Sequence, residues 1–405
     1  MANVSSSNDL EKRPKLRFPG FDEPWKATKF GNLVHEFSDR TKEENEDLLL
    51  SAAIEGMFLN TELFGHQRGA SNKGYKKIKY GTMVLSTQNL HLGNANVNQR
   101  FEHGMVSPAY KTYDITGCSV ELIAQWIKSE AAKRFFYNAT TVGASVCRRN
   151  VEWDTLYEQP LYLPGIDEQD KIAKFLFLIS ERINKQQQFI VSLKKYKRGL
   201  LSREFGQQEN GVLNNRYVGK LKDYFHLSSG STPSSTNRAF YSGNIRWVSS
   251  GELKPKYLCE TSQHISSEAV SSCNLREYQA NTLLVAMYGL EAAGVRGTAS
   301  ILSVPATISQ ACMAIQQTGE IDIEYLYYWY IYNGQWIGIQ IAQGTKQHNL
   351  STDTLGNLRI HAPSCSKQKK VCKLLSQIDY LIEKECKKID LLSSVKRGLL
   401  QQLFI

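Results

Sequence analysis

"KRGLL" occurs twice in this chain, at Lys197–Leu201 and at Lys396–Leu400, so the two copies lie 199 residues apart. Shifting the sequence by that distance aligns two long segments without a gap. They are "PGIDEQDKIAKFLFLISERINKQQQFIVSLKKYKRGLLSREF" (Pro164–Phe205) and "PSCSKQKKVCKLLSQIDYLIEKECKKIDLLSSVKRGLLQQLF" (Pro363–Phe404). The chain is therefore a tandem duplication, in which each of these related segments follows a more divergent one.

Both segments carry residues that recur in alternating steps of four and three, which is the heptad spacing of a coiled-coil seam. The predicted seam is Ile172, Leu176, Ile179, Ile183, Gln186, Ile190 and Leu193 in the first segment, and Val371, Leu375, Ile378, Ile382, Glu385, Ile389 and Leu392 in the second. Gln186 and Glu385 interrupt the seam at the same place. Each fixes the register and the partner, or else lies near solvent, and the sequence leaves both alternatives open.

The length of the segments predicts how the two helices pair. About 38 helical residues span roughly 57 Å. The second globular segment begins where the first helix ends, and it ends where the second helix begins. An antiparallel pair is the economical arrangement, because a parallel pair would force that segment to bridge the whole rod. We expect an intramolecular antiparallel coiled coil, with the globular parts at opposite ends and related by a pseudo-twofold axis.

The globular segments have short β-like runs separated by Gly, Asn and Ser, and each also has a helical stretch, at residues 120–136 and 323–333. The predicted class is therefore α+β. We divide the chain into a polar N-terminal tail (1–15), a first globular domain (16–163), a first helix (164–206), a second globular domain (207–362) and a second helix (363–405). The apolar stretch at 323–342 contains Glu324 and Asn333, which favours a buried helix over a membrane span.

The charge balance favours an anionic partner. Lys and Arg number 49 against 39 Asp and Glu, which gives a formal net charge of +10 and an isoelectric point near 9.0. None of the eight cysteines has CxxC spacing, so no metal site is expected, and scattered thiols fit a reducing cytoplasm. The polar N-terminus has no apolar core of a secretory signal. These features suit a cytoplasmic protein that binds either a nucleic acid or an anionic membrane surface.

Polar and basic side chains on predicted loops are the candidates for contact with DNA, because Arg, Lys, Asn, Gln and Ser bind base edges and phosphates. They are Lys76, Lys77, Asn94, Asn96, Arg100, Arg148, Arg149, Ser229, Thr232, Arg238, Arg246, Arg296, Lys346, Gln347 and His348. Residues 143–150 and 344–349 occupy equivalent places before the two helices. Each stretch either faces a DNA groove or is a solvated loop that caps the next helix, and both interpretations stay open.

Motifs for catalysis are absent from the sequence. It has no GxxxxGK[ST] loop, no HExxH and no stretch like the NPPY of adenine methyltransferases. Asp223, Glu252 and Lys254 match a magnesium-dependent nuclease motif only weakly, since Glu-x-Lys is common by chance. The chain is expected to have no catalytic residues. Two other functions stay open as alternatives to a non-catalytic protein that reads a DNA sequence. One is a coiled-coil scaffold with non-specific basic domains, and the other is a standalone DNA nuclease.

Four stretches resemble the specificity (S) subunit of type I restriction-modification systems: "LRFPGFDEPW" (Leu16–Trp25), "PGIDEQDKIAKFL" continuing to "KRGLL", "GNIRWVSSGEL" (Gly243–Leu253) and "GTKQHNLSTDTLGNLRIHAP" (Gly344–Pro363). The resemblance covers nearly the whole chain after residue 15. The second helix departs from the pattern because "PSCSKQKKV" has no counterpart of Glu168.

The resemblance implies that the globular domains are target-recognition domains and that each reads one half of a bipartite, asymmetric double-stranded DNA target. It also implies that the paired helices set the spacer and bind two methyltransferase (M) subunits that carry S-adenosylmethionine. Two restriction (R) subunits that use ATP and Mg²⁺ can join them. This chain itself is then expected to hold no cofactor and to be no enzyme.

Overall fold

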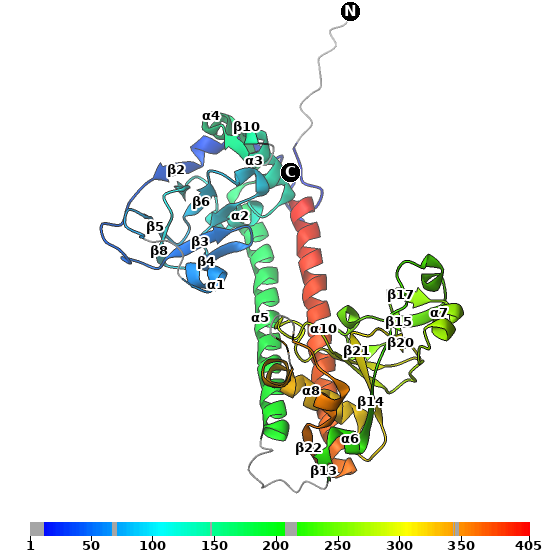
Figure 1. Cartoon of the computed structure of the whole chain (residues 1–405). Coiled ribbons are helices and arrows are strands. Elements are labelled where there is room, and N and C mark those ends of the chain that lie inside the picture. Colours follow the sequence, from blue (N-terminus) through cyan, green and yellow to red (C-terminus); the bar gives the residue numbers. More distant parts are fainter. Residues whose placement is uncertain (1–11, 67–70, 146–147, 207–216, 343, 345–347) are drawn as a thin grey trace, which may run out of the picture. The chain divides into compact units, whose positions relative to one another are not determined.

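The computed structural model describes residues 12–66, 71–145, 148–206, 217–342, 344 and 348–405. The chain forms two compact units: unit 1 comprises 1–188 and 386–405, and unit 2 comprises 189–385. Each unit contains one globular part and a portion of each of two long helices, α5 (Ile166–Phe205) and α10 (Cys365–Leu403) (Figure 1). The predicted α+β class and the two long helices are confirmed.

Unit 1 contains a four-stranded sheet in the order β2-β9-β6-β7 and the two-stranded pairs β1-β12, β3-β4, β5-β8 and β10-β11. Its strands are β1 (Lys26–Lys29), β2 (Val34–Phe37), β3 (Leu50–Ala53), β4 (Gly56–Leu59), β5 (Lys76–Lys79), β6 (Met83–Ser86), β7 (Ala95–Val97), β8 (His103–Val106), β9 (Tyr110–Ile115), β10 (Thr140–Ser145), β11 (Arg148–Val151) and β12 (Pro160–Leu163). Its shorter helices are η1 (Phe30–Asn32), α1 (Asn60–Phe64), η2 (Leu90–Leu92), α2 (Val120–Trp126), α3 (Glu130–Asn138) and α4 (Trp153–Glu158).

Unit 2 contains a five-stranded sheet in the order β14-β21-β18-β19-β16, a three-stranded sheet β17-β15-β20, and the pair β13-β22. Its strands are β13 (Tyr217–Lys220), β14 (Phe225–Ser229), β15 (Ile245–Val248), β16 (Tyr257–Leu258), β17 (Gln263–Ile265), β18 (Leu283–Ala286), β19 (Ala299–Leu302), β20 (Thr307–Ile308), β21 (Cys312–Gln317) and β22 (Arg359–Ala362). Its shorter helices are α6 (Leu221–Tyr224), η3 (Arg238–Tyr241), η4 (Ser250–Glu252), α7 (Ser267–Ser272), α8 (Ile323–Trp336), η5 (Ile337–Ile341) and α9 (Thr352–Gly356).

The long helices run antiparallel within each unit. In unit 1, Leu176 near the start of α5 shares a hydrophobic core with Leu400 and Leu403 near the end of α10. In unit 2, the relation is reversed, because Phe205 at the end of α5 shares a core with Leu375 near the start of α10. The antiparallel pairing predicted from the chain connectivity is therefore present in each unit on its own.

The seam residues lie on the inner side of both helices. Every predicted seam position is buried or half-buried, whereas most positions between them are exposed. Gln186 and Glu385 are only 9% and 6% exposed. This burial excludes the alternative that the two polar seam residues lie near solvent.

Two glutamines, 199 positions apart, attach each globular part to its long helix in the same way. Gln169 accepts a hydrogen bond from the backbone N–H of Ser119 at 2.8 Å, and Gln368 accepts one from the backbone N–H of Asp322 at 2.8 Å. Each glutamine also donates to the carbonyl oxygen of the proline five residues earlier, at 2.9 Å. Ser119 and Asp322 are the N-caps of α2 and α8. The duplication has therefore preserved this joint.

Local structure departs from the sequence-based expectations in several places. The helix predicted over 120–136 is two helices, because the Ser129 hydroxyl accepts the backbone N–H of Ala132 at 3.1 Å and starts α3 anew. Lys76, Lys77 and Asn96, which were predicted to lie on loops, belong to strands β5 and β7. By contrast, the buried helix expected in the apolar stretch is present as α8, and most of its side chains lie in the core of unit 2.

Among the helices that the structure describes, none is both long enough and apolar enough to cross a membrane.

Candidate nucleic-acid interface

Four of the predicted DNA-contacting residues lie around the three-stranded sheet of unit 2: Ser229, Thr232, Arg238 and Arg246. Strand β15 is the middle strand of this sheet, antiparallel to β17 and parallel to β20. The segment after β14 lies against the sheet, since the Ser231 N–H donates to the Ile308 carbonyl at 3.1 Å and Trp247 Nε1 donates to the Ser231 carbonyl at 3.2 Å. The hydroxyl oxygen of Thr232 accepts the backbone N–H of Gln310 at 3.3 Å.

A glycine allows this segment to approach the sheet closely. A Cβ atom on Gly230 would lie 2.2 Å from the Ile308 carbonyl oxygen and 2.4 Å from that of Ser309. Such contacts are far shorter than van der Waals distance, so only glycine fits here. The stretch "SSGSTPSSTNR" (Ser228–Arg238), which is rich in serine and threonine, is therefore fixed to the sheet as far as Ser231–Thr232, and its remaining residues lead to the exposed Arg238 on η3.

Arg246 differs from Arg296 because its side chain makes no hydrogen bond or ion pair with the residues that the structure describes. Its Nε atom is enclosed and makes no hydrogen bond, and the side chain as a whole is half-buried. It lies directly opposite His264 in the antiparallel register. Arg238 is exposed on η3.

Arg296 and His348 form a second group in unit 2, and both make contacts within the chain. The guanidinium of Arg296 donates to the carbonyl oxygens of Leu290 at 2.8 Å and Glu291 at 2.7 Å. The backbone N–H of His348 donates to the Glu291 carboxylate at 2.9 Å, and this hydrogen bond is the main cause of the lowered pKa of Glu291. The neighbouring candidates Lys346 and Gln347 lie outside the described residues.

In unit 1, the candidate lysines on β5 are not free surface cations. Lys76 is 6% exposed, and burial lowers the pKa of its ammonium group. Lys77 forms an ion pair with Glu46, which is the main reason that the pKa of Glu46 falls to about 2. Alternation along β5 turns Lys76 inward with Ile78. The contact of Lys76 with DNA stays a prediction, made for a side chain that is buried in the free chain.

The candidates of residues 93–100 are also engaged internally. Asn96 is 1% exposed; it donates to the Ala53 carbonyl at 2.8 Å and accepts from the Lys128 ammonium at 2.5 Å. Arg100 forms a fork with the Glu62 carboxylate at 2.9 and 2.7 Å, which lowers the pKa of Glu62. Asn94 is half-buried, and its side-chain oxygen lacks a hydrogen-bond partner. Asn96 is a buried structural residue and not a surface one.

The loop predicted at 143–150 is part of a hairpin of β10 and β11, with a bulge between Val142 and Ser145. Arg149 donates to the hydroxyl and carbonyl oxygens of Thr140 at 2.7 and 2.6 Å, and its guanidinium lies 4.2 Å from the centre of the Tyr137 ring. Arg148 belongs to β11, and its side chain lies outside what the structure describes.

The carboxylates of the possible nuclease motif hold turns together. Asp223 accepts the backbone N–H of Lys220 at 2.7 Å. Glu252 accepts the backbone N–H of Ser249 at 2.9 Å and that of Ser262 at 2.6 Å. Burial opposes ionisation of Glu252, but these hydrogen bonds outweigh it and lower its pKa. Both carboxylates therefore have structural uses.

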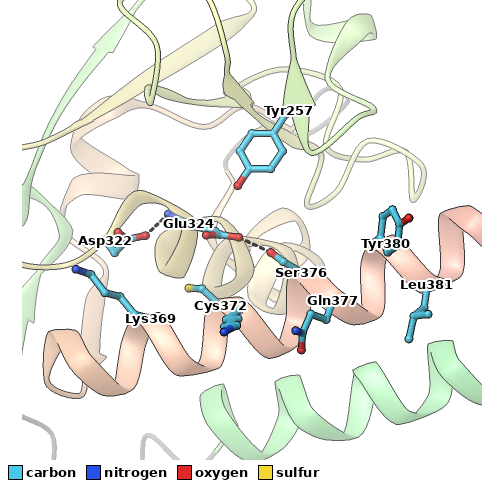
Figure 2. A pocket seen from close by; sticks show the side chains of 10 residues that line it. Tyr257, Asp322, Glu324, Lys369, Cys372, Ser376, Gln377, Tyr380 and Leu381 are labelled. Carbon is cyan, nitrogen blue, oxygen red and sulfur yellow. Dashed lines mark hydrogen bonds between the residues drawn. The ribbon is translucent and has the colours of Figure 1, made fainter.

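Unit 2 also contains a pocket of about 790 Å³ beside α10 (Figure 2). Within the described part of the chain, the acidic or thiol group able to hold a metal ion is Asp322, Glu324 and Cys372 in this pocket. Asp322 already caps α8 by accepting the Glu324 N–H at 2.8 Å, and Glu324 pairs with Lys256. Burial raises the pKa of the Cys372 thiol, so it stays protonated and is a poor metal ligand.

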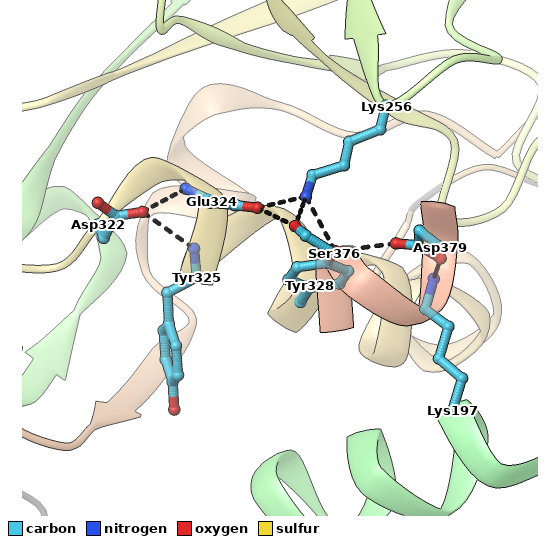
Figure 3. Close-up of polar contacts among 8 residues, drawn as sticks. All are labelled: Lys197, Lys256, Asp322, Glu324, Tyr325, Tyr328, Ser376 and Asp379. Atoms are coloured by element: carbon cyan, nitrogen blue, oxygen red, sulfur yellow. Dashed lines mark hydrogen bonds and ion pairs between the residues drawn. The ribbon is translucent and has the colours of Figure 1, made fainter. Parts of the chain in front are cut away.

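A polar network next to the pocket connects the globular part of unit 2 to both long helices (Figure 3). Lys256 bonds Glu324, the Tyr328 hydroxyl at 2.9 Å and the Ser376 hydroxyl at 2.5 Å. The Tyr328 hydroxyl donates to Asp379 at 2.8 Å. Asp379 also accepts from Lys197 of α5 at 2.5 Å. The network therefore joins the segment before β16, α8, α10 and α5.

Comparison with known proteins identifies what the chain resembles. Residues 216–393 match the sequence profile of the family described as "Type I restriction modification DNA specificity domain". The specificity subunit of the type I restriction enzyme MjaIX from Methanocaldococcus jannaschii is 29% identical over 192 residues, which are 46% of this chain and 43% of that protein. The chain thus spans less than half the length of this curated relative.

Solved structures share the fold over nearly the whole chain. One, from a study titled "Structural basis underlying complex assembly and conformational transition of the type I R-M system", has a TM-score of 0.61 at 13% identity and covers 96% of this chain and 99% of its own. The type I S subunit from M. genitalium has a TM-score of 0.59 at 14% identity, with coverages of 97% and 99%. At these identities, the likeness establishes the fold.

Proposed function

We propose that the chain is a specificity subunit of a type I restriction-modification system and that it reads a bipartite, asymmetric DNA target without catalysing a reaction itself. In this proposal, the globular part of unit 1 reads one half of the target and that of unit 2 reads the other. Base pairs between the halves are left unread.

The observation that carries the proposal is the repeated joint between globular part and helix. Gln169 in unit 1 and Gln368 in unit 2 make the same two hydrogen bonds, although the surfaces that the two globular parts present are different. Two globular parts that are attached to the helices in the same way but have different surfaces suit a target made of two different half-sites. The excess of basic residues supports contact with phosphates and predicts affinity that falls as salt rises.

The proposal assigns the chemistry to partner subunits. Two M subunits carry S-adenosylmethionine and methylate adenine, and two R subunits supply ATP- and Mg²⁺-dependent cleavage. The long helices α5 and α10 bind the M subunits and fix the number of unread base pairs. The complex acts on DNA in the host cytoplasm.

Long-read sequencing of host DNA tests the proposal. We expect methyladenine on both strands of a two-part motif with a fixed gap, lost when the gene for this chain is deleted and restored when it is returned. Methylation that persists without the chain would refute the assignment, because the specificity would then reside elsewhere. A deletion strain that carries only the M subunits is the matched control.

A further inference from the structure

We propose that Arg246, with His264 opposite it on the neighbouring strand, is a DNA-contacting residue of unit 2 and binds acceptor atoms of the target directly. This inference rests on the proposed function and names residues for it. It comes from an unusual feature of the free chain: a half-buried guanidinium whose Nε is enclosed without a hydrogen-bond partner.

The other half-buried or stacked candidates differ in this respect. Arg296 donates to two carbonyl oxygens. Arg276 lies over the Tyr278 ring at 5.4 Å and next to the His226 ring. In unit 1, Arg100 donates to Glu62 through both terminal nitrogens, and Arg149 donates to Thr140 through Nε and one terminal nitrogen. Partial burial of a charged group without a partner costs free energy, and nothing in the described chain offsets that cost for Arg246.

The strand geometry fixes the direction of the side chain. Ile245 and Trp247 pack in one small core with Ile265 of β17. Because side chains alternate along a strand, Arg246 lies on the other face of β15. His264 is its directly opposite residue, so both side chains lie on that face. Val248, two residues further along on the same face as Arg246, is buried in a second core with Ile308. The half-buried guanidinium of Arg246 therefore lies next to that core and is positioned by the strand.

The surroundings of Arg246 suit DNA. Arg238 and the segment containing Thr232 lie around the same sheet, and both are exposed. A guanidinium with free terminal donors binds two acceptors at once, which matches O6 and N7 of guanine or two oxygens of a phosphate. Both acceptor pairs belong to DNA, and the variants below distinguish them.

The experiment compares Arg246→Gln, Arg246→Lys and the control Arg359→Gln in the full chain bound to its M subunits. Arg359 is an exposed arginine on β22 and is not among the predicted DNA contacts. Binding is measured on duplexes that carry the methylated motif or a single changed base pair, at several salt concentrations. Thermal unfolding of the same variants is recorded in parallel.

We expect Arg246→Gln to weaken binding on the order of ten- to a hundredfold, while Arg359→Gln leaves it unchanged. If Arg246 contacts a base, Arg246→Gln should bind the motif and a duplex changed at one base pair of one half-site equally well. Arg246→Lys should not restore the preference for the motif at that base pair. A phosphate contact appears as uniform weakening, a salt slope smaller by about one, and partial rescue by Arg246→Lys. The unfolding temperature of Arg246→Gln should not fall, because no internal hydrogen bond is lost.

Unchanged affinity, motif and salt slope for Arg246→Gln would overturn the inference. So would weaker binding that is fully accounted for by a lower unfolding temperature, because Arg246 would then have a structural role. If the motif depends on this chain but not on Arg246, only this inference fails. If no motif depends on the chain, the proposed function fails as well.

Discussion

Lys197 of α5 donates to Asp379 of α10 at 2.5 Å in unit 2. The equivalent residues of the duplication, Lys396 and Ser180, are joined at 2.7 Å in unit 1. The same contact thus occurs in both units, once as an ion pair and once as a hydrogen bond to a neutral hydroxyl. The 199-residue shift that relates the two sequences also relates these contacts between the helices, which explains why both copies of "KRGLL" keep their lysine.

This difference predicts that Ser180→Asp stabilises unit 1. Burial lowers the pKa of the Lys396 ammonium, and a carboxylate beside it would raise that pKa and add a charge-assisted hydrogen bond. We expect about 1 kcal/mol of added stability near neutral pH. The matched variant Asp379→Ser should cost unit 2 a similar amount, because Lys197 and the Tyr328 hydroxyl lose their shared acceptor. Thermal unfolding reports both, and a less stable Ser180→Asp chain would contradict the argument.

The two glutamine joints predict equal effects in the two units. Gln169→Leu leaves the Ser119 N–H without its acceptor, and Gln368→Leu does the same to the Asp322 N–H. Each should cost about 1–3 kcal/mol, because a buried donor is left unpaired. Hydrogen exchange of these two amides is the measurement. Exchange should accelerate only in the unit that carries the substitution, and unchanged protection in both would show that the joint does not hold the helix start.

The glycines of "KRGLL" differ from the core glycine Gly334. A Cβ on Gly199 or Gly398 would meet no atom within 4 Å, so alanine at either position should stabilise the helix by about 0.5–1 kcal/mol. A Cβ on Gly334 would lie 2.2 Å from the Gly297 Cα, so Gly334→Ala should cost about 2 kcal/mol or more. Urea unfolding monitored by circular dichroism distinguishes the two classes. Equal destabilisation by all three variants would mean that the helix glycines are also needed for packing.

Lys128 predicts a pH dependence for unit 1. Burial lowers the pKa of its ammonium to about 8, below the value of about 10.4 for an unfolded lysine. Between these values the unfolded chain binds more protons than the folded one, so stability rises as pH increases from 8 to 10. Relative to Lys128→Met, the wild type should gain about 1–2 kcal/mol between pH 7 and pH 10.

Parallel unfolding curves of wild type and Lys128→Met at both pH values would disprove this linkage. The exposed Lys174 provides the control, and Lys174→Met should follow the wild-type curve.

The long helices could be predicted from the sequence because their heptad spacing continues over many turns, with one polar residue in each seam, and the antiparallel pairing followed from chain connectivity alone. The short β-like runs predicted in the globular segments are present as strands, for example β15 and β18. Periodicity is a property of neighbouring residues, so a single sequence contains it. The joint made by Gln169 and Gln368 was visible as identical letters in the gapless alignment, but their role depends on backbone atoms elsewhere in the fold.

The DNA-contact candidates were harder to predict, because the availability of a side chain depends on partners far away in sequence. Arg100 pairs with Glu62, 38 residues earlier, and Lys77 pairs with Glu46, 31 residues earlier. Lys76 is buried because a strand, and not a loop, places it beside the core. Residue type alone cannot distinguish basic side chains that are paired or buried within the chain from Arg246, whose Nε is unpaired.

Selection from a random duplex library tests the central claim most directly. The full chain, bound to its M subunits, is incubated with random-sequence DNA, and the retained duplexes are sequenced. The account predicts two different short motifs at a constant separation with no preference between them, and Arg246→Gln should alter the selection at one half only. Retained DNA with no enriched sequence would favour a scaffold with non-specific basic domains, and a single continuous motif would contradict the division of reading between the two units.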